Sequence, residues 1–278
     1  MPEDLDAYCS DWVASIPKIY FELREILDDP DSSFHDMELV ISGDPALTAR
    51  LLKIVNSPFF SFPSNVETIS HALNIIGTQQ LSDLVLATTI MEQFKGIPPE
   101  VVNMDSFWRH SMATGVLAKR LAIEHNGHSS ERYYVAGMLH DIGSLVIYNK
   151  NPIKSKEALE RSHKEKENLF VSESKVFGFD HADVGGALLE SWKLPQPLVE
   201  AVAYHHYPSA AKTDKKLTAV VHIADVMAYE MKYTGSGEHS TPELELESLE
   251  LLGVTKSHLA GIMEELGNTI DETIAMFL

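Results

Sequence analysis

The sequence predicts an all-α protein, a multi-helix bundle, and three observations support that prediction. Apolar residues recur at helical spacing over most of the 278 residues, as in Leu47, Leu51, Ile54 and Val55. Capping residues and glycines stand where such helices would begin and end. No segment alternates apolar and polar residues over the length of a strand, so no β-sheet is expected.

Two helices in the N-terminal part of the chain have clearly marked ends. Asp44 is placed as the N-cap of the first, with Pro45 at the first helical position. The second has an apolar stripe made of Ile69, Leu73 and Ile76. Gly77 is placed to end it, and Thr78 can cap the helix that follows.

The rest of the chain is expected to be helical in two further parts. Helices fit the ranges 105–126, 130–148, 181–192, 195–206, 214–232 and 255–277. A glycine and two prolines in 95–105 separate an N-terminal helical lobe, 1–95, from a central lobe, 105–233. The C-terminal helices, 242–278, are too few for a domain and should pack back on the body. The most basic segment, 150–168, is expected to be a solvated helix face.

Composition and charge exclude several classes of partner and site. Asp and Glu outnumber Lys and Arg by 41 to 22, and the formal charge of −19 repels phosphate backbones and anionic lipids. We therefore expect no nucleic-acid partner and no membrane partner. The acidic N-terminus does not resemble a signal peptide, and the single cysteine, Cys9, permits no intramolecular disulfide. These features favour the cytoplasm.

Several of the thirteen histidines lie in or beside apolar helices, together with two aspartates. These candidate metal ligands are His110, His140, Asp141, His181, His205, His206 and Asp225. Imidazole nitrogen and carboxylate oxygen are ligands of Zn, Fe, Mn and Ni. A single helical histidine is more often a surface or core residue, and His222 is assigned to structure. Because helix neighbours point about 100° apart, one of His205 and His206 should face away from any common centre.

The order and context of these residues resemble the HD superfamily of metal-dependent phosphohydrolases. On that resemblance the ligands of one ion are His110, His140, Asp141 and Asp225. The extra histidines of members that hold two metals, such as HD-GYP phosphodiesterases, correspond to His181 and one of His205 and His206. The resemblance implies one or two divalent transition-metal ions (Fe, Mn, Zn or Ni). If the protein is an enzyme, Asp141 is the catalytic residue that bridges them.

Longer phrases resemble the HDOD domain, a bacterial signalling module, over one unit from about residue 12 to 278. They are DPALTARLLKIVNSPFFSF, ISHALNIIGTQQLSDLVLA, FWRHS, AGMLHDIG and HADVGGALLESWKLPQPLVEAVAYHH. HDOD proteins are similar to HD-GYP enzymes in fold but generally lack demonstrated hydrolysis. Two departures argue against hydrolysis of a cyclic dinucleotide. Ser144 stands where the enzymes usually have lysine, and HHYPSAAK lacks the GYP signature.

The resemblance therefore implies a stand-alone bacterial signalling module with an intact HD-type metal site in its central lobe. It would bind a signalling protein or a small phosphate-containing ligand, and a homodimer is possible. The alternative is a metal-dependent phosphohydrolase or phosphodiesterase acting on a nucleotide or phosphate ester. Phe59, Phe60 and Phe62 lie in an expected loop, 56–64. Core packing is the default for them, and they would form a docking patch if exposed.

Overall fold

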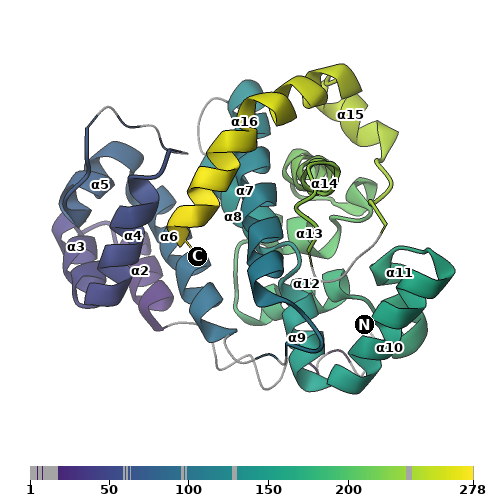
Figure 1. The fold of residues 1–278 in the computed structure, drawn as a ribbon. Helices are drawn as coiled ribbons and strands as arrows, with labels where there is room; N and C mark the ends of the chain where they lie inside the picture. The colour runs from purple at the N-terminus through teal and green to yellow at the C-terminus, as the bar shows by residue number, and fades with distance from the viewer. Residues whose placement is uncertain are drawn as a thin grey trace. The chain divides into compact units, whose positions relative to one another are not determined.

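The computed structural model describes residues 5, 8, 18–58, 60, 62, 64–94, 97, 99–126, 130–235 and 240–277. All regular structure in these residues is helical, which confirms the all-α prediction (Figure 1). The chain forms two compact units. One comprises Ser15–Lys95 with Gly267–Leu278, and the other comprises Met1–Ala14 with Gly96–Leu266. The lobe boundaries expected from the sequence stay a prediction.

The unit that contains Ser15–Lys95 is built from short helices with defined caps. They are α2 (Lys18–Asp28), α3 (Phe34–Ser42), α4 (Pro45–Val55), α5 (Ile69–Ile76) and α6 (Thr78–Gln93). The Asp44 side chain accepts hydrogen bonds from the first turn of α4, so the predicted N-cap is confirmed. Gly77, at φ 89°, ends α5 as predicted. The prediction that Thr78 caps the next helix is wrong, because Thr78 is itself the first residue of α6.

The larger unit, Gly96–Leu266, surrounds a buried central helix. Its elements are α7 (Met104–Asn126), α8 (Ser130–Leu139), α9 (Ile142–Lys150), α10 (Pro152–Glu165), α11 (Leu169–Phe177), α12 (His181–Ser191), α13 (Gln196–Ala203), the 3₁₀ turn η2 (Pro208–Ala210), α14 (Lys215–Glu230) and α15 (Leu246–Leu252). The last helix, α16 (Lys256–Phe277), begins in this unit. Every residue of α14 from Leu217 to Tyr229 is buried, and α7, α8, α13 and α15 pack around it (Figure 1).

The helix expected over 130–148 is interrupted, which corrects that expectation. α8 ends at Leu139 and α9 begins at Ile142, so His140 and Asp141 lie in the break. His140 donates its Nδ1–H to the carbonyl oxygen of Gly137 at 2.6 Å. In a continuous helix that carbonyl would accept the N–H of Asp141 instead. The side chain of His140 thus competes with the backbone at the point where the helix stops.

Two surface expectations can be compared with the described residues. The 150–168 segment contains α10 and the turn that follows it, where exposed ion pairs such as Lys156–Glu160 lie on the surface. Phe59 lies outside the described residues, whereas Phe60 and Phe62 are half-buried and stack with ring centroids 5.8 Å apart. Within the described residues, no helix combines the length and the apolar character needed to cross a membrane.

Candidate metal centre

All seven candidate ligands converge within the larger unit. His110 comes from α7, His140 and Asp141 from the break between α8 and α9, and His181 from the start of α12. His205 and His206 follow α13, and Asp225 lies on α14. Six of the seven are at most 6% exposed, and His206 is half-buried. Burying so many ionisable groups is costly unless they bind one another or a cation.

Hydrogen bonds at Nδ1 fix the orientation of three of the imidazole rings. The accepting backbone carbonyls are those of Tyr233 for His110 (2.8 Å), Gly137 for His140 (2.6 Å) and Val202 for His205 (2.7 Å). A carbonyl accepts only from a protonated Nδ1, so in the neutral ring the lone pair is on Nε2. Metal-ligating histidines are typically oriented in this way.

The first group of ligand atoms surrounds the Nε2 of His110. His140 Nε2 lies 3.2 Å from it, Asp225 Oδ1 lies 3.1 Å from it, and Asp141 Oδ2 lies 3.6 Å from it. These atoms come from three places in the sequence, since His140 and Asp141 are neighbours. The ligand atoms of His110, His140 and Asp225 all lie within 4.8 Å of one another, as expected of residues that share one ion. Together with Asp141, these are the residues that the family resemblance implies for one ion.

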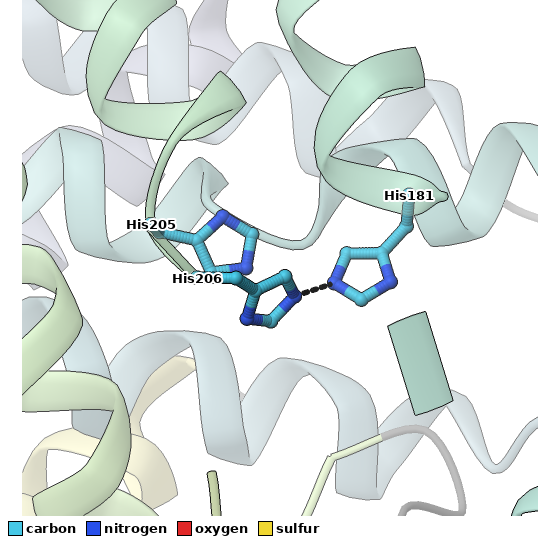
Figure 2. A group of neighbouring side chains, drawn as sticks. All are labelled: His181, His205 and His206. Carbon is cyan, nitrogen blue, oxygen red and sulfur yellow. Dashed lines mark hydrogen bonds between the residues drawn. The ribbon is translucent and has the colours of Figure 1, made fainter. Parts of the chain in front are cut away.

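The second group consists of three histidines that face each other (Figure 2). His206 Nε2 lies 2.8 Å from His181 Nε2, and the rings of His205 and His206 are 3.9 Å apart. The expectation that one of His205 and His206 faces away is wrong. Both residues follow the end of α13, so the 100° helix rule does not apply to them. Asp141 Oδ1 lies 3.3 Å from His181 Nε2 and 3.6 Å from His205 Nε2, and so joins the two groups.

The charges in the cluster are unevenly distributed. Burial lowers the pKa of His140, but the Asp141 and Asp225 carboxylates outweigh burial and raise the pKa to about 9. Burial would raise the pKa of Asp141, yet His140 and His181 hold it well below the usual range. Burial, together with the charge of His140, lowers the pKa of His205 to about 3. His205 is therefore a neutral imidazole with an available lone pair.

The donor set fits a divalent metal ion. His205 Nε2 is buried and has no hydrogen-bond partner. Because Nδ1 of His205 carries the proton, this Nε2 can only accept, and a bound cation would satisfy it. The nitrogen and oxygen donors suit Zn, Fe, Mn or Ni and do not distinguish among them.

Glu173 on α11 supports the site and is not among the candidates predicted from the sequence. Its Oε2 accepts from the Nδ1–H of His181 at 2.6 Å and from the His181 backbone N–H at 3.0 Å. Glu173 is 1% exposed. A carboxylate behind a ligating histidine fixes its tautomer and raises its basicity. The only signal in the sequence was an acidic residue inside the apolar stretch LFVSESKVF.

His222 has the structural role assigned from the sequence. Its Nδ1–H donates to the carbonyl oxygen of His205 at 2.7 Å, and its Nε2 accepts the backbone N–H of Glu245 at 2.9 Å. Both ring nitrogens are therefore used. His222 holds the turn that carries the paired histidines and does not itself face the centre.

The match to a family model decides the classification. The model of the HDOD domain matches residues 13–208 of this chain. The chain belongs to the HDOD family. An HDOD domain protein of unknown function from Geobacter sulfurreducens has a similar crystal structure, with a TM-score of 0.76, 25% identity, and coverage of 99% of this chain and 97% of that one.

The chain is also similar to two further proteins. A presumed phosphohydrolase from Shewanella amazonensis SB2B has the same fold, with a TM-score of 0.76, 24% identity and 98% coverage of both chains. An uncharacterized protein from Treponema pallidum (strain Nichols) is 26% identical over 218 residues, which are 78% of this chain and 42% of that relative. The chain thus spans about two fifths of the length of that curated relative.

Proposed function

We propose that this HDOD protein is a bacterial signalling module that binds two divalent transition-metal ions in its larger unit and acts by binding a partner. The partner is a signalling protein or a small phosphate-containing ligand. The metal ions would hold together the helices that supply the seven ligands. The free energy of metal binding would then add to the stability of the folded state. The cytoplasm is the proposed compartment, consistent with the single cysteine.

The orientation of the imidazole rings is the observation that carries the proposal. In three of the rings Nδ1 donates to a backbone carbonyl: those of His110, His140 and His205. In His181, Nδ1 donates to the carboxylate of Glu173. Four separate hydrogen bonds therefore turn four Nε2 atoms toward the carboxylates of Asp141 and Asp225. A purely structural histidine cluster would not need all four Nε2 atoms to face the same space.

The surroundings of the centre favour binding over phosphoester hydrolysis. Ser144, in the position where the resembling enzymes usually have lysine, is 1% exposed and carries no charge. Arg109 neighbours His110 in sequence, but its guanidinium pairs with Asp105 at 2.6 Å on an exposed face. The charged side chains that contact the seven ligands are histidines and carboxylates. These side chains include no lysine or arginine that could stabilise the charge developing on a phosphoryl group during hydrolysis.

Phosphohydrolase activity is the second candidate, and one observation favours it. Asp141 contacts both ligand groups, the arrangement expected of a carboxylate that bridges two ions. Bound metal ions lower the pKa of a coordinated water toward ~7 and clamp phosphoryl oxygens. In this alternative, Asp141 would hold the two ligand groups together beside the substrate. Its carboxylate would stay charged, because its pKa is held low.

Metal content of Asp141→Ala tests the proposal. Untagged protein purified without chelator, or reconstituted with Zn or Mn, should hold about two equivalents by plasma mass spectrometry. Asp141→Ala should lose most of both, because Asp141 contacts both groups. The matched control is Asp31→Ala, an exposed aspartate in the other unit, which should keep wild-type content. Wild-type protein that holds no metal after reconstitution would contradict the proposal.

The same three metal-reconstituted proteins distinguish the signalling module from the phosphohydrolase. Incubated with bis(4-nitrophenyl) phosphate and with nucleotides, the wild type should release no more product than Asp141→Ala. Turnover present in the wild type and Asp31→Ala, but abolished in Asp141→Ala with native circular dichroism, would establish the hydrolase instead.

A further inference from the structure

A pocket of about 630 Å³ lies beside the candidate metal centre, within the larger unit. Its walls come from α11, from the turn after α13 and from the segment that leads into α15. Its lining includes two aromatic residues, one of the candidate ligands and three glutamates: Phe170, Tyr207, His206, Glu243, Glu245 and Glu247. The pocket therefore shares one residue, His206, with the centre.

His206 connects the pocket to the buried ligands. It is the only one of the seven that is not fully buried, and its Nε2 lies 2.8 Å from His181 Nε2. Its ring stacks on Phe170 with centroids 4.2 Å apart, and its Nδ1 has no hydrogen-bond partner. Directly behind it, the buried Nε2 of His205 is also without a partner. Access to the centre from the pocket thus passes His206.

The formally charged residues in the described lining of the pocket are all negative. Three glutamates line it, Glu243, Glu245 and Glu247, and its described lining contains no Lys or Arg. The second histidine in the wall, His222, uses both ring nitrogens in hydrogen bonds. One of these bonds is to the backbone N–H of Glu245, and it anchors the acidic segment to α14. A concave surface of one sign concentrates ions of the other sign and raises their association rate.

We propose that this acidic pocket is the inlet through which divalent metal ions reach the centre. Glu243 and Glu247 attract the hydrated cation, and His206 is the first ligand it meets. His181 and Asp141 lie next along the path. His206 Nε2 is 2.8 Å from His181 Nε2, which is in turn 3.3 Å from Asp141 Oδ1. The inference rests on the proposed metal-binding function and adds the route of entry.

The rate of Co²⁺ uptake tests the inlet. Metal-free protein is mixed with Co²⁺ in a stopped-flow instrument, and the visible absorption of the ligated ion is followed. We expect Glu243→Gln/Glu247→Gln to take up Co²⁺ about tenfold more slowly than the wild type in low salt. The difference should shrink toward 1 M salt, where charges are screened over about 3 Å. The final stoichiometry should be unchanged.

A matched double variant controls for net charge. Glu190→Gln/Glu264→Gln removes the same two charges from exposed sites that do not line the pocket, and should load within twofold of the wild-type rate. Equal uptake rates in the inlet variant and the wild type would overturn the inlet. A reduced final stoichiometry in the inlet variant would overturn it too, since the glutamates would then be ligands. If the wild type binds no Co²⁺, the proposed function itself fails.

Discussion

Replacing Gly143 by alanine should separate α9 from α12 and disable the metal centre. A Cβ at this position would lie 2.0 Å from the carbonyl oxygen of His181 and 2.5 Å from the backbone nitrogen of Gly185. Cβ atoms essentially never approach other atoms within 3.0 Å, and here the obstacle is backbone, which cannot rotate away. The two helices must therefore move apart by about 1 Å, the difference between 3.0 and 2.0 Å.

A movement of about 1 Å should cost the fold only part of its stability, but it should displace the ligand atoms too far to share an ion. Overpacking of this kind costs about 1–3 kcal/mol of unfolding free energy, and backbone contact places Gly143→Ala at the upper end. Asp141 lies two residues before Gly143, and its Oδ1 is 3.3 Å from His181 Nε2. Metal sites tolerate deviations of roughly 0.2 Å in ligand distance, so a 1 Å displacement should abolish shared coordination.

Urea unfolding of the metal-free protein and metal content after reconstitution measure the two effects separately. Gly261→Ala is the matched control, because Gly261 lies in the exposed part of α16 and a Cβ there meets nothing within 4 Å. The control should be stabilised by about 0.5–1 kcal/mol and should bind metal normally. If Gly143→Ala unfolds within 0.5 kcal/mol of the wild type and keeps its full metal content, the packing argument is refuted.

Two other variants probe groups that support the site and the fold. Glu173→Gln should weaken metal affinity about 10–100-fold in a chelator competition, because it removes the negative charge behind His181. The helical content should not change. Unchanged metal affinity would show that Glu173 does not have this role. Burial would raise the pKa of Glu200, but hydrogen bonds from Thr213 and Lys212 lower it. A lowered pKa means that ionised Glu200 stabilises the fold above pH 4.5, and that this contribution is lost as pH falls further. Glu200→Gln should therefore cost about 1–3 kcal/mol at pH 7, and its gap from the wild type in urea unfolding should narrow below pH 4.5; a gap that widens in acid would contradict this.

The candidate ligands could be selected from the sequence because burial of a charge is so costly. His140 and Asp141 stand inside an apolar run, and His222 and Asp225 lie in another. Such residues need partners, which narrows thirteen histidines to a few. The sequence assigned His222 to structure but could not say which residues it holds in place. Its role became clear only from its hydrogen bonds to the turn of His205 and to Glu245.

Helix geometry gave the wrong expectation at two places, both in the site. The break at His140 and the turn at His205 depart from the helical pattern because side chains there compete for backbone carbonyls. A periodicity argument assumes that the backbone satisfies itself, so it extends helices through such positions. Because the helices stop there, both members of the pairs His140-Asp141 and His205-His206 reach the centre. In a regular helix, one member of each pair would have pointed away.

By itself the sequence determined the helical class, the caps at Asp44 and Gly77, the family resemblance and the set of candidate metal ligands. These depend on local spacing and on side-chain chemistry, which a linear pattern records. Only the tertiary structure decided that Glu173 lies behind His181, that Asp141 contacts both ligand groups, and that an acidic pocket opens at His206. Those facts depend on which helices pack together and how closely, and such long-range contacts leave no periodic trace in the chain.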